Sequence, residues 1–168
     1  MSEYRFPDGA WSHVTTVASV AVFLAEELKR SGRKVEVDLV RAAALLHDLG
    51  KAPGVPRDVD HAAASARIAA ERGYAELVEA VRRHLLEAVL DPERQPRNLE
   101  EKLVYYADKL VARDFVGLAA RFSDLKRRYP GSASLIEECW PAVRAMEAEL
   151  FKDLRIRPED LAGLAGLA

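Results

Sequence analysis

The sequence predicts an all-α protein, and two features of its residue pattern support this fold class. Apolar residues recur at steps of three and four positions along most of the chain, which is the spacing of one face of a helix. β-Branched residues do not alternate with polar residues over any long stretch, so the pattern typical of a half-buried strand is missing. We therefore expect about six to seven helices that pack into one compact bundle.

The length and composition indicate an ordinary globular protein. The 168 residues are enough for one domain with a sizeable core, so we expect a single domain over 1–168. Hydrophobic residues make up 49% and charged residues 31% of the chain, which is a usual balance. The net charge of −2 gives no strong signal for nucleic-acid binding or for an anionic membrane.

The chain also lacks the features of a secreted or membrane-spanning protein. Its longest apolar run is far shorter than the ~20 residues that a membrane helix needs. Its N-terminus lacks the basic start and apolar core of a signal peptide, so we expect a cytoplasmic protein. The single cysteine, Cys139, excludes an intramolecular disulfide and a thiolate-cluster metal site.

The first expected helix covers residues 12–30. Ser12 suits its N-cap, and Gly32 follows its end. His13 lies in its first turn, at the spacing that places it on the same stripe as the valines, alanines and leucines of this helix.

The second expected helix covers residues 38–49 and ends in the stretch LLHDLGK. An apolar run leads directly into His47 and Asp48, and an ionised carboxylate that is buried must be paired or must bind a metal. Neighbouring residues lie about 100° apart around a helix, so both side chains lean toward one point only at a helix end. Gly50 suits the left-handed position that stops such a helix.

Two further helices carry the remaining histidines. A loop over residues 51–60 contains two prolines and a glycine, and Asp58 or Asp60 then caps a helix that begins near His61 and stops before Gly73. The next helix is expected over 75–90, with His84 on the edge of its apolar stripe.

The second half of the chain predicts one long helix and one shorter helix. The long helix starts near residue 99, carries Asp108 on its inner stripe and stops at Tyr129-Pro130-Gly131. Another helix covers about 132–154, and a short turn follows Pro158. These segments form a helical extension over about 114–155 and a short tail over 156–168.

Five polar residues thus fall on the inner faces of five successive helices: His13, His47, His61, His84 and Asp108. A single core histidine is more often a hydrogen-bonded structural residue than a ligand. Five such groups would each need a buried partner of their own, whereas a shared cation satisfies them together. The purely structural alternative requires all four histidines to be core residues by coincidence.

The local sequences resemble a known family. HVTTVASVAVFLAEEL follows the first histidine, LLHDLGK surrounds the doublet, and YYADKL surrounds the last aspartate; in this order and spacing they resemble the HD-domain metal-dependent phosphohydrolases. His61 and His84 are similar to the two extra histidines of the subset that binds two metals. The resemblance covers about residues 12–113 and implies an HD-domain helical bundle with its metal-binding core there.

The resemblance also implies a set of metal ligands. A first ion would be held by His13, His47, Asp48 and Asp108, and a second by His61, His84 and the bridging Asp48. Imidazole and carboxylate ligands suit several metals, so we expect one or two divalent ions, with iron or manganese favoured and cobalt, nickel, zinc or magnesium left open.

The expected reaction is hydrolysis of a phosphoester or phosphoanhydride, with a nucleotide as the phosphorylated small-molecule substrate, by metal-activated water. His47, Asp48 and Lys51 are the expected catalytic residues, and Lys51 and Arg113 are expected to bind substrate phosphate. The alternatives are that Lys51 balances the negative end of its helix and that Arg113 is a solvated surface charge.

Other side chains near these motifs have competing interpretations. Lys109 is expected on the surface, because it points about 100° away from its neighbour Asp108. Tyr105 and Tyr106 fit core positions better than a base-stacking role. Arg82 and Arg83 either line the mouth of the site or are exposed helix charges.

Two rival functions use the same residues. A diiron oxygenase would need the same six ligands, and a non-catalytic nucleotide-binding module would keep the pocket without turnover. The chain has HAAASARIA where many two-metal members carry a glycine, so Ala64 or Ser65 would allow the helices to approach. No Gly-Tyr-Pro loop is present, which disfavours the cyclic dinucleotide phosphodiesterases. The amphipathic helices after Arg113 leave a homodimer open.

Overall fold

The computed structural model describes residues 8–56 and 60–164 of the chain. Within this part the regular structure is entirely helical, and the one bridge between extended residues is an isolated pair, Val111 and Phe115. The all-α prediction is therefore confirmed. The α-helices are α1 (Asp8–Arg30), α2 (Val37–Leu46), α3 (His61–Glu71), α4 (Val78–Arg82), α5 (Leu99–Asp108), α6 (Leu118–Arg128), α7 (Ala133–Phe151) and α8 (Leu161–Leu164).

Five short 3₁₀ segments connect these helices in the described chain: η1 (Leu49–Lys51), η2 (Ala75–Leu77), η3 (Leu86–Leu90), η4 (Pro130–Ser132) and η5 (Pro158–Asp160). None of the described helices is both long and apolar enough to cross a membrane.

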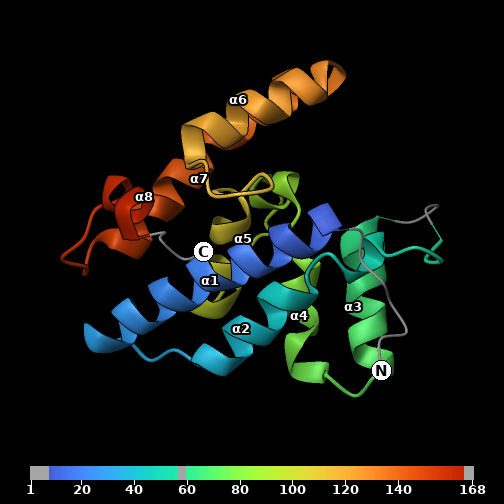
Figure 1. Cartoon of the computed structure of the whole chain (residues 1–168), viewed down its shortest axis with the longest axis horizontal. Helices are drawn as coiled ribbons and strands as arrows, with labels where there is room; N and C mark the ends of the chain where they lie inside the picture. The colour runs from blue at the N-terminus through green and yellow to red at the C-terminus, as the bar shows by residue number, and fades with distance from the viewer. Residues whose placement is uncertain (1–7, 57–59, 165–168) are drawn as a thin grey trace.

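Helix α1 is central to the main core. It packs against α2 and α5, and these three helices lie close together in Figure 1. The apolar stripe of α1 is buried, and Leu24 and Leu28 are fully inaccessible within the same cluster as Leu103 of α5. The helix begins four residues earlier than predicted, so Ser12 lies inside it and is not its N-cap. A glycine costs only about 1 kcal/mol inside a helix, and Gly9 does not interrupt the first turn.

The prediction that the second helix continues to residue 49 is wrong. Helix α2 stops before His47, and His47 and Asp48 form a turn that leads into η1. Gly50 is not among the glycines with positive φ, so it does not stop the helix in a left-handed conformation. It is needed for another reason, because a Cβ at this position would lie 2.1 Å from the carbonyl oxygen of His61.

The close approach of η1 and α3 depends on small residues of α3. The hydroxyl of Ser65 accepts a hydrogen bond from Gly50 N at 2.7 Å and donates one to His61 O at 2.7 Å. Ala64 is also buried against this turn. These two small side chains let the start of α3 lie directly against the turn that carries the His-Asp doublet.

The two ends of α3 agree with the sequence pattern. The carboxylate of Asp60 accepts a hydrogen bond from Ala63 N at 2.6 Å and caps the helix. Gly73 follows its end with a φ of 83°. The alternative cap, Asp58, lies outside the described residues.

The helix expected over 75–90 is divided into η2, α4 and η3. Leu85 has an extended backbone with a ψ of 144°, so the chain turns between α4 and η3. His84 lies in this turn and not on a helix face. Segment η3 then packs against α7, which fixes the position of the turn.

The long helix expected from residue 99 is also divided. Helix α5 ends at Asp108, and Gly117, with a φ of 81°, precedes the start of α6. The carbonyl of Leu110 accepts hydrogen bonds from Val116 N and Gly117 N at 2.9 and 3.0 Å, which closes the intervening loop. Figure 1 shows that α6 lies at the top of the molecule, away from α1 and α2. Helix α7 and the turn after Pro158 agree with the prediction.

Candidate metal centre

The structure brings together the six residues that the sequence suggested as metal ligands, and most of them lie at helix ends. His61 is the first residue of α3, and Asp108 is the last residue of α5. His47 and Asp48 occupy the turn after α2, and His84 occupies the turn after α4. His13 comes from the body of α1. The side chains of residues far apart in the sequence therefore meet in one place.

Two histidines and two carboxylates form the first half of the cluster. The Nε2 atom of His13 lies 3.1 Å from Asp108 Oδ1 and 3.7 Å from Asp48 Oδ2. The Nε2 atom of His47 lies 3.7 Å from each of the same two oxygens. Two ligand atoms that are each about 2.1 Å from one metal ion are about 3.0 to 3.5 Å apart at ordinary coordination angles. The observed spacing is close to this range, and the ligand atoms of His13, His47 and Asp108 all lie within 4.8 Å of one another, so these three residues fit around one ion, with Asp48 Oδ2 beside His13 and His47.

The second half of the cluster lies on the other oxygen of Asp48. Asp48 Oδ1 is 3.4 Å from His61 Nε2 and 3.5 Å from His84 Nε2. The two histidine Nε2 atoms are 3.0 Å apart. His47, Asp48 and His84 also place one ligand atom each within 4.8 Å of one another. Each oxygen of the Asp48 carboxylate thus faces a different pair of histidines, which is the arrangement of a bridging ligand.

Backbone carbonyls orient three of the four imidazoles. The Nδ1 atoms of His13, His47 and His84 lie 2.6 Å from the carbonyl oxygens of Ala112, Ala44 and Val81, respectively. A carbonyl oxygen only accepts hydrogen bonds, so each Nδ1 carries the proton. The Nε2 lone pair of each ring is then directed toward the carboxylates, which is the usual arrangement of a metal-binding histidine.

The electrostatics of the cluster also suit a cation. Burial raises the pKa of Asp48, but the neighbouring His47, His84 and Lys51 outweigh this and hold its pKa well below the usual value. Burial lowers the pKa of His61 to about 3 and also lowers the pKa of His84. The carboxylate is therefore ionised and these two histidines are neutral near pH 7, as metal binding requires.

Two buried polar atoms of the cluster have no hydrogen-bond partner within the described residues: His47 Nε2 and Asp48 Oδ1. The Lys51 ammonium lies 2.8 Å from Asp48 Oδ1, but it is aligned to donate to Oδ2, at 2.9 Å. Burying polar atoms without partners is costly, and a cation in the cluster would satisfy both. The donor set therefore fits a divalent metal.

Lys109 belongs to this cluster, although the sequence pattern places it on the surface. Its side chain is only 4% exposed, and its Nζ donates to Asp108 Oδ2 and, at 2.6 Å, to the carbonyl of His84. The ammonium also lies 4.7 Å from the centre of the Tyr105 ring. The surface prediction is wrong because the turn after α4 covers the end of α5, where the carbonyl of His84 accepts a hydrogen bond from the Lys109 ammonium. Burial raises the pKa of Asp108, but the charge of Lys109 and the close approach of His13 and His47 lower it further, well below its usual value.

Two pockets border the cluster. The first, here named the cationic pocket, has a volume of about 280 Å³, and its charged lining consists of His13, Asp48, Lys51, Arg113, Arg121 and Arg128. The second, here named the apolar pocket, has a volume of about 360 Å³ and is lined on one side by Leu85, Leu86, Leu125, Leu135 and Ile136. His61, His84 and Lys109 form part of its other side. Lys51 lines both pockets, and Arg113 lines the cationic pocket, so both residues border the cluster.

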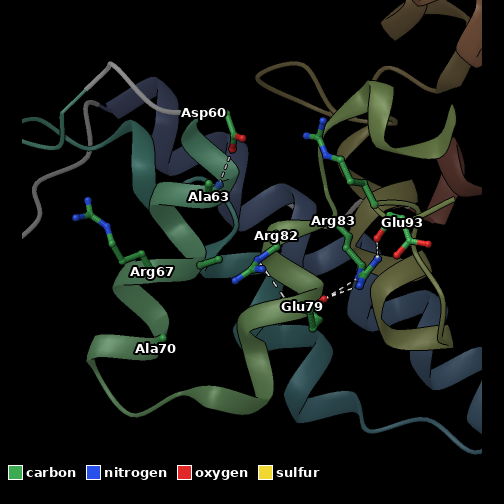
Figure 2. Close-up of a pocket in the computed structure, with 10 residues that line it drawn as sticks. Asp60, Ala63, Arg67, Ala70, Glu79, Arg82, Arg83 and Glu93 are labelled. Carbon is green, nitrogen blue, oxygen red and sulfur yellow. Dashed lines mark hydrogen bonds and ion pairs between the residues drawn. The ribbon is translucent and has the colours of Figure 1, made fainter. Parts of the chain in front are cut away.

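Arg82 and Arg83 do not line these pockets. They lie beside a separate pocket of about 590 Å³ between α3 and α4, where Figure 2 shows Arg83 pointing toward Glu79. The guanidinium of Arg83 is 2.6 Å from Glu79 Oε2 and 2.9 Å from the carbonyl of Glu93. Arg83 therefore holds the chain after α4 in place and is buried, so neither interpretation fits it, whereas Arg82 is exposed and agrees with the commoner interpretation as a helix charge.

The tyrosines beside Asp108 are core residues. Tyr105 and Tyr106 are fully buried, and the hydroxyl of Tyr105 donates to the carbonyl of Leu86 at 2.7 Å. Tyr106 donates to the buried carboxylate of Glu147. Neither ring is free to stack on a base, which agrees with their interpretation as core residues.

The fold and the site together define an all-helical domain with a buried cluster of imidazoles and carboxylates suited to divalent metal. The HD domain family model matches residues 10–113, which is more than half of the chain, so the protein belongs to the HD-domain family. HD domains bind divalent metals, and the family commonly comprises metal-dependent phosphohydrolases. The predicted family is thus confirmed, whereas the two-metal subset and the roles of individual residues stay predictions.

Two relatives match about three fifths of the chain. An uncharacterized protein of Methanocaldococcus jannaschii is 34% identical over 110 residues, which are 59% of this chain and 64% of that protein. A protein of Picrophilus torridus named tRNA (cytidine(56)-2′-O)-methyltransferase is 34% identical over 113 residues, which are 61% of this chain and 31% of that protein. The match thus spans less than two thirds of the length of either relative. No solved structure matches the chain.

Proposed function

We propose that this protein is a phosphohydrolase that uses divalent metal to cleave a phosphoester or phosphoanhydride bond of a nucleotide. The observation that carries the proposal is the position of Asp48, whose two carboxylate oxygens face two different pairs of histidines. A carboxylate shared in this way suits two ions held side by side, which is the arrangement of two-metal phosphoryl-transfer sites.

The proposed ligands fall into two sets. His13, His47, Asp48 and Asp108 would hold one ion, and Asp48, His61 and His84 would hold the other. Divalent cations at such a site polarise the phosphoryl oxygen and lower the pKa of the attacking water.

The protein groups around the ligands have three tasks. The carbonyls of Ala112, Ala44 and Val81 hold the imidazoles in one orientation, so little reorganisation is needed during the reaction. Lys109 keeps Asp108 ionised by its contact with the carboxylate. Lys51 is 46% exposed and touches Asp48, so its ammonium lies where negative charge develops on the phosphoryl oxygens.

The substrate class follows from the family and from the lining of the two pockets. Arg113 and Lys51 supply positive charge beside the cluster, and the apolar pocket offers space for an organic group. The name of the Picrophilus torridus relative refers to tRNA, and the matched segment is only 31% of that protein. A substrate panel should therefore contain nucleotides and RNA-derived phosphoesters.

Metal analysis and activity assays on matched variants test the proposal. Protein purified without chelator is expected to contain stoichiometric metal and to hydrolyse at least one phosphorylated substrate in the presence of manganese or iron. Asp48→Asn should lose both properties, whereas Asp38→Asn removes a fully exposed carboxylate of α2 and should keep them.

Two results would overturn the proposal. One is the absence of bound metal together with no metal-dependent hydrolysis, and the other is equal activity of Asp48→Asn and the unmodified protein. An oxygen-consuming reaction with iron that is silent with manganese would instead support an oxygenase.

A further inference from the structure

Helix α6 lies outside the segment that matches the HD domain family, 10–113, yet it borders the metal centre. Arg121, Leu125 and Tyr129 are spaced by four residues and line both the cationic and the apolar pocket. Residues at this spacing share one side of a helix and its end. One stripe of α6 therefore forms a wall common to both pockets, above the cluster of ligands.

Arg121 has an incomplete set of partners. Its side chain is 13% exposed, and its Nε atom is buried without a hydrogen-bond partner in the described parts of the chain. Within the described residues, its one ion pair is a long one, 3.4 Å to Asp124 Oδ2, and the same carboxylate lies 2.5 Å from Arg127 and 2.7 Å from Arg128. Because a guanidinium has five N–H donors in a planar fork, Arg121 keeps donors free for an anion with several oxygens.

The charges of the cationic pocket exceed what one phosphate at the metal centre requires. Lys51, Arg113, Arg121 and Arg128 line it, whereas two carboxylates pair with them, Asp48 with Lys51 and Asp124 with Arg121 and Arg128, so the pocket keeps a net positive charge. A phosphate beside the ligands would already face the metal charge. The surplus of positive charge therefore favours a second anionic group on the same substrate.

We propose that Arg121 binds a substrate phosphate and that the α6 wall places the two ends of the substrate in different pockets. A phosphate beyond the reacting one occupies the cationic pocket against Arg121 and Arg128. The organic end of the substrate occupies the apolar pocket against Leu125. The substrate class is accordingly a nucleotide with at least two linked phosphates, and the placement of its reacting phosphate rests on the function proposed above.

Binding of a non-hydrolysable nucleotide tests this assignment. We would measure the Kd of adenosine 5′-(α,β-methylene)diphosphate by calorimetry for the metal-loaded protein and its variants. Arg121→Ala should weaken binding by about ten-fold or more, because a charge-assisted hydrogen bond to phosphate is lost. Arg121→Lys should recover part of the affinity. Arg127→Ala is the matched control, since Arg127 also pairs with Asp124 but is 77% exposed and lines neither pocket.

A comparison with adenosine monophosphate tests the second phosphate. The unmodified protein should bind the diphosphate analogue more tightly, and Arg121→Ala should reduce this preference. Equal Kd values for Arg121→Ala and Arg127→Ala would overturn the assignment, as would failure of the unmodified protein to bind the analogue. The melting temperature of every variant shows whether it folds. If Arg121→Ala does not fold, Arg121→Gln is measured in its place.

The two proposals fail in distinguishable ways. If the protein hydrolyses a nucleotide and Arg121→Ala has an unchanged KM, the role of Arg121 is refuted while the phosphohydrolase proposal stands. If nothing is hydrolysed but the analogue binds more weakly to Arg121→Ala than to Arg127→Ala, the role of Arg121 in phosphate binding stands while the phosphohydrolase proposal fails.

Discussion

Gly50→Ala should damage the protein at one defined contact. The added methyl carbon would lie 2.1 Å from the carbonyl oxygen of His61 and 2.9 Å from the Cβ of Ala64. The first of these atoms is backbone, so no side-chain rotation relieves the clash and the start of α3 must move. Overpacking of this kind typically costs about 1 to 3 kcal/mol. For a chain of this size, that corresponds to a fall in Tm of about 2 to 12 °C.

The position of His61 makes this substitution informative about the metal centre as well. Because the His61 imidazole lies beside Asp48 Oδ1 and His84 in the proposed second ligand set, its displacement should weaken binding of a second ion and leave a first ion in place. We would record Tm by calorimetry and metal content by elemental analysis. Gly131→Ala is the control, since a Cβ there meets nothing within 4 Å. A Gly50→Ala protein with the Tm and metal content of Gly131→Ala would refute the reasoning.

Three further predictions concern the same region. Lys109→Met should lower the free energy of unfolding of the metal-free protein by about 3 kcal/mol in denaturant titrations, because it leaves the Asp108 carboxylate buried without its ammonium partner. Ser65→Ala should cost about 1 to 3 kcal/mol and speed hydrogen exchange of the amide that donates to Ser65, since that buried amide loses its acceptor. The stability of chelator-treated protein should fall as pH decreases from about 6.5 toward 4, because His61 and His84 have lowered pKa values and the unfolded chain takes up their protons first.

Each of these predictions has a control or a result that would contradict it. Lys102→Met removes a more exposed ion pair with Glu149 and should cost less than about 1 kcal/mol; an equal effect of the two lysine variants would contradict the role of Lys109. Unchanged exchange in Ser65→Ala would contradict the contact with η1. In the pH series, each histidine changes the free energy of unfolding by at most about 1.4 kcal/mol per pH unit. The change is smaller for His61, because its side chain is partly exposed. A slope unaltered by His84→Ala would show that other groups cause the pH dependence.

The sequence was sufficient to find the residues of the cluster but not the backbone that presents them. Histidines on apolar faces were visible from their spacing, and the structure brings all of them together with Asp48 and Asp108. Their local geometry was not predictable, because His47 and His84 lie in turns that interrupt an otherwise helical pattern. Lys109 was missed for the same reason, since its burial depends on the end of α5.

Two other features depend on contacts between segments distant in the sequence. Gly50 resembles a helix stop when only its sequence neighbours are considered. A glycine is needed there because the carbonyl of His61, on the next helix, leaves no room for a Cβ. Arg121 was not recognised because the apolar spacing continues across residues 109–117 and predicts one unbroken helix. Gly117 is the single residue that signals the break, and its positive φ redirects the chain so that α6 borders the site.

The loop between α5 and α6 connects the environment of His13 directly to helix α6. Its Ala112 carbonyl sets the orientation of His13, and its far end, at Gly117, sets the direction of α6. Any change in the length of this loop is therefore transmitted both to a ligand nitrogen and to the guanidinium of Arg121. A relative that accepts a substrate of another size would have to change the α6 wall without shifting Ala112. We therefore expect the residues that set the substrate range to vary after Gly117 and not within the loop itself.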